Sequence, residues 1–499
     1  MKTLQFPRFK KLAQGECAGA PILRRLWDTF DFSLLMTQSG IYKDRGVPTW
    51  ILAFVYVLGL IAQKSSVVQK AKMAAKDALL GPMFGEHSIK QYTLSRFFTA
   101  DYDWTGFGRK RVERLQREEQ TCLKEGDQIN LDDTLLAHPY AKQLPFLSWL
   151  FDHARKTYVW GMNLVVLQAV LKSGLEYPLS YAVWHKPKDG EPEKTKFDLA
   201  RELLLQLRKT VSCRLWIAMD RWYLCKDFFV FLMEHRFDWV TKAKRNTALY
   251  RQEIEPLTGR VRYVPVRPIH LIREVFHQLV KSSSPGLTSV SIPNIYMKLP
   301  CWKESKRGPK RLVKKQCFVA IAAVVAIRLK EDEEQPDVTE TDPEAVALYR
   351  GAYLIISNRA DAPKDALMAY MKRWRIEVFF RTAKQELGMQ QCHSTTEIHH
   401  HAHLELLLAA ETLLSYALWQ QNKEKTSDDE GYTHGEMVRG LFHTRCQVRV
   451  NNQKGVQRIF IDFDTEVQGF ARLIRLFWPD DIRMLWVPKE NYQCIPSSA

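Results

Sequence analysis

The chain has 499 residues, of which 46% are hydrophobic and 26% are charged, so its composition excludes a disordered protein and provides for large buried cores. Lys and Arg outnumber Asp and Glu by 73 to 56. The resulting formal charge of +17 favours a polyanionic partner such as DNA or RNA, although a basic enzyme without such a partner would show the same excess. At about 100–200 residues per domain, the length accommodates two to four domains.

Cysteine usage and apolar runs bear on the compartment. The nine cysteines are scattered and form no CxxC pair, which is typical of a reducing compartment and argues against a zinc ribbon. The longest apolar run, 50–62, is shorter than the about 20 residues that a membrane span needs. The first residues contain no apolar signal core. We therefore expect a cytoplasmic protein with no membrane contact.

The first quarter of the chain is predicted to be helical. Apolar residues recur at three- and four-residue spacing between about 20 and 125, and the run 50–62 is predicted to be a buried helix. The region ends in a basic stretch whose cations either track DNA phosphates or form a solvated helix face, and the pattern favours neither. These cations are Arg109, Lys110, Arg111 and Arg114.

From residue 126 the pattern changes to alternating strands and helices in the order β-β-β-α-β-α-β. Each predicted strand is a short apolar run, and each predicted helix is amphipathic. The strands are expected at 129–134, 158–174, 177–185, 214–219 and 237–244, and the helices at 197–211 and 226–235.

Between about 246 and 355, β-type runs and loops predominate, including a buried strand at 317–329. The acidic stretch 331–344 is expected to be a solvated surface loop. A strand at 351–358 leads to a helix over 369–389 and then to a long apolar helix over 403–421. The remainder is predicted to be a polar linker and a small region with one strand at 456–464.

Two of the predicted strands end in aspartates. Asp132 and Asp133 follow Leu131, and Asp220 follows the run 214–219. The carboxyl end of a buried strand is a common place for a functional group in an α/β sheet. An aspartate there is also a common turn or helix cap. The phase of the first strand favours Asp132 as the functional carboxylate and leaves Asp133 as the alternative.

The helix over 369–389 carries a lone carboxylate, Glu377, among cations and aromatic rings. At about 100° per residue, Glu377 lies with three other polar side chains in an arc of about 60°, next to the apolar face. Ion pairs within the helix would also account for such a stripe. The polar stripe consists of Tyr370, Arg373, Glu377 and Lys384, and the apolar face consists of Ile376, Phe380, Ala383 and Leu387.

The same four polar residues form a spaced motif: Tyr, two residues, Arg, three residues, Glu, six residues, Lys. With the surrounding text, YMKRWRIEVFFRTAKQELGM, it resembles the signature of DDE transposases of the insertion sequence 4 superfamily. The resemblance extends to LDDT and MDRWY and, with the order of the elements, covers roughly 126–420. The first 125 residues and the last 80 match only loosely.

The resemblance implies an α/β fold, with an RNase H-like catalytic core interrupted by a β-rich insertion. It implies a catalytic triad of Asp132, Asp220 and Glu377 that binds two Mg²⁺ or Mn²⁺ ions, which prefer oxygen ligands. The expected reaction is cleavage of DNA at terminal inverted repeats, through a hairpin, and transfer to target DNA. Relatives act as dimers on DNA, so we expect a homodimer in the DNA complex and association with the nucleoid.

In such enzymes Tyr370, Arg373 and Lys384 would grip phosphates near the cleaved end, which carries a flipped base. Trp302 is the only tryptophan between 246 and 350, and it is the candidate platform for that base. A tryptophan after a proline is also a common packing residue. His399 and His403 have the spacing of zinc ligands, but without a following HExxH pattern a polar helix start is the favoured interpretation.

The expected division follows these patterns. An N-terminal helical DNA-binding region, 1–125, precedes the first part of the core, and a β-rich insertion separates this part from the second part, which carries the signature helix. The remaining segments are the first core part at 126–245, the insertion at 246–355, the second core part at 356–420 and a C-terminal region at 421–499. A domesticated DNA-binding protein without transposition activity and a metal-dependent nuclease without strand transfer are the alternatives.

Overall fold

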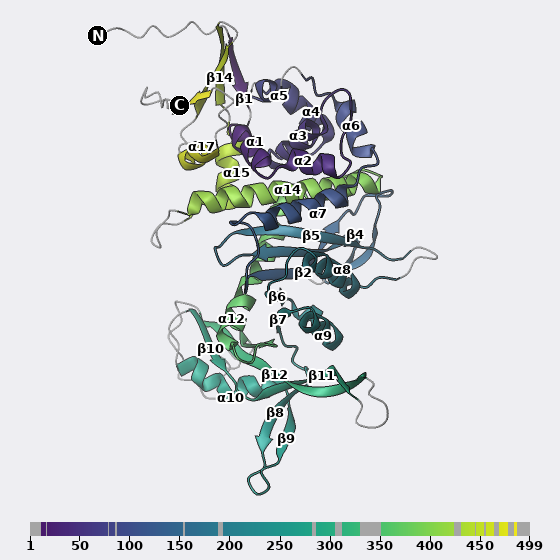
Figure 1. Cartoon of the computed structure of the whole chain (residues 1–499), viewed down its shortest axis with the longest axis vertical. Coiled ribbons are helices and arrows are strands. Elements are labelled where there is room, and N and C mark those ends of the chain that lie inside the picture. Colours follow the sequence, from purple (N-terminus) through teal and green to yellow (C-terminus); the bar gives the residue numbers. More distant parts are fainter. Residues whose placement is uncertain are drawn as a thin grey trace, which may run out of the picture.

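The computed structural model describes residues 11–15, 17–77, 79–84, 87–152, 155–187, 193–281, 286–304, 312–329, 351–423, 431–444, 446–453, 456–463, 469–477 and 484–486. The acidic stretch 331–344 and most of the predicted polar linker lie outside the described residues. The molecule is elongated, with the helices of the N-terminal region at one end and the strands that follow residue 246 at the other (Figure 1).

Helices occupy the described chain from residue 20 to residue 117, as the apolar spacing predicts. The run 50–62 forms a helix that is buried along almost its whole length, because it is apolar on every side. The helices are α1 (Ala20–Thr29), α2 (Phe32–Gln38), α3 (Thr49–Ile61), α4 (Val67–Lys76), α5 (Leu80–Phe84), α6 (Gln91–Thr99) and α7 (Trp104–Arg117).

The first described strand of the chain lies beside strands of the C-terminal region (Figure 1). Strand β1 (Lys11–Gly15) pairs antiparallel with β14 (Cys446–Gln453), in a sheet with β15 (Val456–Phe463) and β16 (Met484–Trp486). The backbone of Gly19 donates to Leu441 O at 2.6 Å, and a Cβ on Gly19 would lie only 2.9 Å from the Leu441 side chain. The helices of this part are α15 (His434–Phe442) and α17 (Ala471–Phe477).

The centre of the molecule is a large mixed sheet, in the order β3-β4-β2-β6-β7-β13-β12-β11-β8-β9. The strands β2, β6 and β7 are parallel to one another, and the other pairings along this order are antiparallel. The first part comprises β2 (Gln128–Ala137), β3 (Ser148–Asp152), β4 (Thr157–Val170), β5 (Glu176–Trp184), α8 (Lys196–Arg208), β6 (Leu215–Met219), η1 (Arg221–Tyr223), α9 (Lys226–Glu234) and β7 (Phe237–Lys242).

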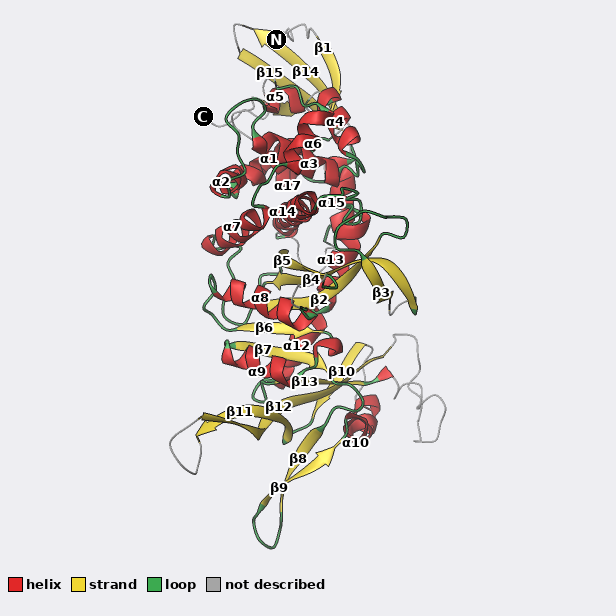
Figure 2. Cartoon of the chain, turned by 90° about the vertical axis from the view of Figure 1, so that its right-hand side faces the viewer, coloured by secondary structure: helices red, strands yellow, loops and turns green. Residues whose placement is uncertain are grey.

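The strands and helices predicted between residues 126 and 245 are confirmed, and one strand of this region was missed. In the C-terminal region the predicted strand at 456–464 corresponds to β15, whereas β14, β16, α15 and α17 were missed. Strand β3 has only five residues, and its exposed positions carry the large rings of Trp149 and Phe151, so it lacks the alternation of apolar and polar residues that marks a half-buried strand. It forms the outer edge of the sheet and projects from the body of the molecule (Figure 2).

The region 246–355 is rich in strands, as expected, but the prediction missed a helix. Residues Pro268–Lys281 form α10, whose apolar residues recur at helical spacing behind a proline that suits the first turn of a helix. The strands are β8 (Leu249–Ile254), β9 (Val261–Val266), β10 (Gly286–Ser291), β11 (Ile295–Glu304), β12 (Leu312–Leu329) and β13 (Tyr353–Ser357).

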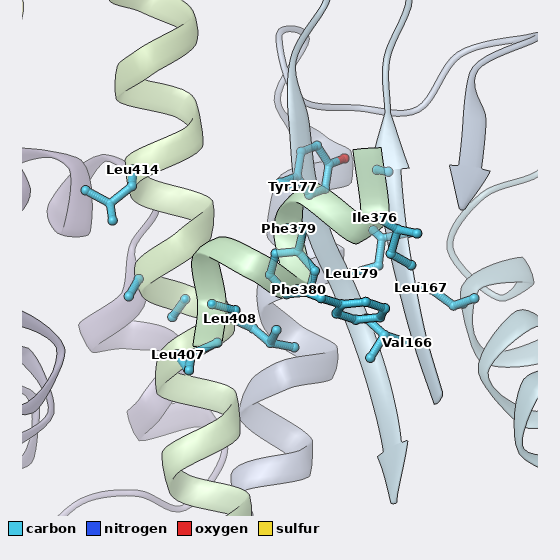
Figure 3. Packing of buried hydrophobic residues seen from close by; sticks show 14 of the residues in the cluster. Val166, Leu167, Tyr177, Leu179, Ile376, Phe379, Phe380, Leu407, Leu408 and Leu414 are labelled. Carbon is cyan, nitrogen blue, oxygen red and sulfur yellow. The ribbon is translucent and has the colours of Figure 1, made fainter. Parts of the chain in front are cut away.

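The single helix predicted over 369–389 is wrong, because the chain forms two helices that meet at Arg373. They are α12 (Pro363–Lys372) and α13 (Trp374–Gln385). At the junction the Ile376 N–H donates to Arg373 O three residues back, so the hydrogen bonding tightens there. The predicted apolar face, Ile376, Phe380, Ala383 and Leu387, is buried, and so is Phe379, which the prediction did not include. Ile376, Phe379 and Phe380 lie against strands β4 and β5 and helix α14 (Figure 3).

Helix α14 (Glu397–Asn422) lies between the N-terminal helices and the sheet (Figure 1). The histidines at its start are packing residues. His403 is buried and its Nδ1 lies 2.9 Å from the Tyr56 hydroxyl, and the His399 ring stacks on Phe98. These packed positions match neither a zinc site nor the polar helix start that the sequence predicted.

Candidate active site

Three parallel strands, β2, β6 and β7, lie side by side and bring acidic and basic side chains together. Leu131 of β2 pairs with Met219 of β6, so the next residues, Asp132 and Asp220, occupy adjoining positions at the end of the sheet. The last pair between β6 and β7 is Ala218 with Val240. Continued by two residues, this register brings Asp220 beside Lys242, the last residue of β7. Asp220 follows the end of β6, as the sequence prediction required. Asp132 does not end its strand, because β2 continues alongside β4 to Ala137 and only its pairing with β6 stops at Leu131.

Glu377 faces the same edge from the first turns of α13, and Arg373 connects it to β2. Arg373 Nη1 donates to Asp132 Oδ2 at 3.2 Å, and its Nη2 donates to Glu377 Oε1 at 2.7 Å. The guanidinium is largely buried, and its Nε has no hydrogen-bond partner among the described residues. One cation therefore lies between two of the three predicted catalytic carboxylates.

The Asp132 carboxyl is strongly perturbed. Its burial, followed by the charge of Asp133, raises its pKa to about 7, and Asp220 acts in the same direction. Arg373 and a backbone hydrogen bond oppose this rise without cancelling it. A carboxyl that resists ionisation beside other carboxylates marks a site that gains from additional positive charge.

Asp133 faces the other side of the sheet, as neighbouring residues of a strand do. Its Oδ2 accepts from Lys196 Nζ at 2.6 Å and from Asn163 Nδ2 at 3.0 Å. Asp133 is thus held in an ion pair with α8, away from α13. Asp132 and Asp133 therefore differ in the face of the sheet on which they lie. The sequence of a single strand does not show which of its two faces meets α13.

Buried amides hold the junction of α12 and α13 on the sheet. Asn130 is fully buried, and its Nδ2 donates to Lys372 O at 3.1 Å, while Gln168 Nε2 reaches Arg375 O at 3.4 Å. These carbonyls flank Arg373, where the two helices meet. Buried polar groups must be paired, so the amides both satisfy the junction and fix the position of Arg373 and Glu377.

The other residues of the motif lie close by but do different things. Arg373 lies over the Tyr370 ring at 5.7 Å, and burial raises the pKa of Tyr370 to about 12, with the charge of Asp220 adding to the rise. Lys384 Nζ donates to Leu135 O at 2.9 Å, so it fastens the far end of α13 to β2. Tyr370, Arg373 and Glu377 therefore lie near the edge that carries Asp132 and Asp220, whereas Lys384 contacts β2 three residues beyond Asp132.

Sequence reasoning missed Lys242 and Tyr353. Lys242 ends β7, lies in the field of Asp220, and its Nζ is 4.5 Å from the centre of the Tyr353 ring. Burial lowers the pKa of Lys242, as do the neighbouring cations, Arg221 first. The sequence did show a lysine at the end of a buried strand. Its position beside Asp220 follows from the register of β6 and β7, which the sequence alone does not give.

The basic stretch of α7 is not a uniform DNA-tracking surface. Arg111 is completely buried and donates to Pro178 O and Leu179 O of β5 and to Thr412 of α14. Arg114 pairs with Asp31 and Glu118. Both expectations for this stretch are wrong for Arg111, whose guanidinium ties α7 to the sheet and α14.

The residues at this edge fit a divalent cation in charge and in donor type, since the three predicted ligands offer only carboxylate oxygens. Among the described residues, no group of three His, Cys, Asp or Glu side chains lies in a position to hold a metal ion. The Arg373 guanidinium stands where positive charge is needed. A metal ion that used both Asp132 and Glu377 would have to displace it.

The raised pKa of Asp132 has a consequence for stability. Its folded-state pKa, about 7, lies above the ordinary aspartate pKa of 3.8, so the fold favours the protonated form. This contribution is present at low pH and is lost as the pH rises through about 7. We expect Asp132→Asn to unfold at a higher temperature than the wild type at pH 8, with a smaller difference at pH 5, in metal-free buffer. Equal differences at both pH values would contradict the assignment.

The geometry defines an α/β protein with an acidic site at the carboxyl edge of a mixed sheet. Residues 131–413 match the model of the transposase DDE domain family, and this segment is more than half of the chain. The chain belongs to this family.

Two other comparisons complete the picture. The chain resembles the cryo-EM structure of a piggyBac transposase synaptic complex with hairpin DNA, with 10% identity and a TM-score of 0.40, over 85% of this chain and 79% of that chain. A comparison with curated protein sequences gives no match. Within the part of the chain that the structure describes, no helix is both long and apolar enough to cross a bilayer.

Proposed function

We propose that the protein is a cut-and-paste DNA transposase of the insertion sequence 4 superfamily, with Asp132, Asp220 and Glu377 as its catalytic triad. The observation that carries the proposal is the meeting of these three acidic residues at one edge of the sheet, in a chain of the transposase DDE domain family. The ordering of strands around them is consistent with an RNase H-like core, and β8–β12 with an insertion in that core.

Asp132, Asp220 and Glu377 would hold two Mg²⁺ or Mn²⁺ ions. Bound there, such ions supply an activated water or hydroxyl and neutralise charge on the leaving oxygen. Asp132 is positioned by β2, and Glu377 by the buried amides under α13. The pKa of Asp132 is raised, so its carboxyl must lose a proton before it can bind a metal ion.

Arg373 then has two roles. Without DNA and metal it neutralises Asp132 and Glu377, and once released it places a guanidinium beside the scissile phosphate. Tyr370 supports it through its ring, and Lys384 holds the end of α13 and lies within reach of the same face of the sheet. The +17 charge of the chain suits the proposed partners, the terminal inverted repeats and target DNA.

The proposed division assigns 1–125 to recognition of the inverted repeats, 126–245 and 356–420 to the core, 246–355 to the insertion and 421–499 to a C-terminal region. Because β1 pairs with β14, the first and last of these regions would act as one body. We further propose a homodimer in the DNA complex, acting on DNA at the nucleoid.

A cleavage assay tests the proposal. The substrate is a linear duplex that carries the coding gene with its flanking DNA, where inverted repeats and a short target duplication are expected. With Mg²⁺ or Mn²⁺ the protein should cut at the outer ends of the repeats, and EDTA should stop it. Specific binding without cleavage would favour a domesticated DNA-binding protein, and cleavage without joining to a target plasmid would favour a simple nuclease.

Trp302 remains the proposed platform for the flipped base of a hairpin intermediate. Its backbone lies in β11 opposite Lys314, while its side chain and the basic segment 305–311 fall outside the described residues. Trp302→Ala is expected to slow hairpin formation by about tenfold or more and to affect first-strand nicking less, because base stacking is worth about 1–3 kcal/mol. Denaturing gels that separate nicked from hairpin products measure both steps, and equal slowing would remove the idea.

A further inference from the structure

A row of aromatic side chains is exposed at the edge of the sheet. Trp149 and Phe151 of β3 stand opposite Trp160 and Tyr158 of β4. The ring centres are 5.5 Å apart in the first pair and 5.3 Å apart in the second. Trp149 is 58% exposed, Phe151 43% and Tyr158 65%, although such rings normally seek burial.

This row lies on the same face of the sheet as Asp132. In β4, Val166 pairs with Asp132 and stands an even number of residues from Trp160, and strand residues two apart share a face. Trp160 and Val166 are six positions apart, so at about 3.3 Å per residue the aromatic row lies about 20 Å from Asp132. A strand whose bases stay stacked at the duplex rise of about 3.4 Å would span this distance with about six nucleotides.

Cations accompany the row along this path. Lys384, which donates to Leu135 O on β2, lies in the electrostatic field of Asp152 and Arg155 at the end of the β3–β4 hairpin. Arg155 and Lys156 are exposed beyond the Phe151 and Tyr158 pair. At the other end, Trp160 Nε1 donates to Ala141 O, next to the exposed Lys142.

We propose that this aromatic row binds an unpaired DNA strand, whose bases stack on the rings while its phosphates follow the cations. The combination of stacking rings with a basic surround is what binds single strands without sequence preference. Duplex DNA keeps its bases stacked inside, so it offers little to these rings. The inference rests on the proposed action on DNA, and adds a strand-holding surface about six nucleotides from the cleavage site.

Binding of a fluorescein-labelled oligothymidine of about 20 nucleotides, followed by anisotropy in EDTA, tests the proposal. Trp149→Ala and Tyr158→Ala should each weaken binding by about tenfold, and Trp149→Phe should retain most of it. Leu205→Ala removes an apolar side chain that is 39% exposed on α8, on the other face of the sheet, and should leave binding unchanged. A matched duplex should lose less affinity than the single strand in each aromatic variant.

Unchanged affinity in the Trp149→Ala, Tyr158→Ala double variant would overturn the proposal. So would a loss of self-association by light scattering without a loss of single-strand binding, which would assign the row to contact with a second copy. Photocrosslinking of the wild type to iododeoxyuridine-containing single strands gives an independent result, since crosslinks should map to 149–160 and crosslinks only elsewhere would also overturn it. Single-strand binding is measured without metal and is therefore independent of DNA cleavage. A protein that fails to cleave DNA could still confirm this inference, and a protein that cleaves DNA could still contradict it.

Discussion

Glu377→Gln is expected to abolish metal-dependent cleavage of an end-containing duplex, by about 10³-fold or more, while DNA binding persists. Residues of a catalytic unit act together, so loss of one removes most of the rate. Glutamine has nearly the same shape and keeps a carbonyl that can accept from Arg373 Nη2, which reaches Glu377 at 2.7 Å in the wild type. The change therefore removes the charge that a divalent ion needs and little else.

The control for this variant is Glu386→Gln, at the end of α13. Glu386 accepts from Gln63 at an exposed position, away from the carboxylate edge, so its loss should leave cleavage unchanged. Single-turnover cleavage and electrophoretic mobility shifts measure the two properties separately. Cleavage by Glu377→Gln at the rate of the wild type would remove Glu377 from the triad, and lost binding would point to misfolding instead.

Asp132→Asn and Asp133→Asn are expected to separate catalysis from stability. Asp132 faces Arg373 and Asp220, so its amide variant should lose cleavage by a similar factor to Glu377→Gln. Asp133 faces Lys196 at 2.6 Å on the other side of the sheet. Asp133→Asn should therefore keep cleavage and lose about 1 kcal/mol of folding stability, the usual value of a partly exposed ion pair.

Cleavage rates and urea unfolding of both variants give the answer. Lys196→Met supplies the matched control, because it removes the other partner of the same ion pair and should reproduce the stability loss of Asp133→Asn. The opposite pattern, an inactive Asp133→Asn and an active Asp132→Asn, would exchange their assignments.

Most helices and strands could be predicted because hydrophobic periodicity is a local property of the sequence. The apolar spacing in α3 and on the core face of α13 predicted burial that the structure confirms, since both depend on residues within a few turns. The strands that carry Asp132 and Asp220 were found in the same way. Strand β3 was missed because it is short and carries rings on its exposed face, so its sequence does not alternate between apolar and polar residues.

The helix break at Arg373 was not predictable from period alone. The residues on both sides have helical spacing, and the junction is stabilised by Asn130 and Gln168 from strands far away in the chain. The contact between β1 and β14 likewise joins segments more than 400 residues apart. Such pairings depend on the whole fold, which local patterns do not contain.

The sequence by itself determined the residue types and their spacing: aspartates directly after two short apolar runs, and Tyr370, Arg373, Glu377 and Lys384 on one stripe. Only the tertiary structure decided what these residues face. Strand register sets Asp132 beside Asp220 and Asp220 beside Lys242, the pleat turns Asp133 toward Lys196, and the packing of α13 brings Arg373 between two carboxylates. The reason is physical: spacing along a chain is a local property, whereas the charge that a carboxylate meets is set by neighbours from other strands and helices.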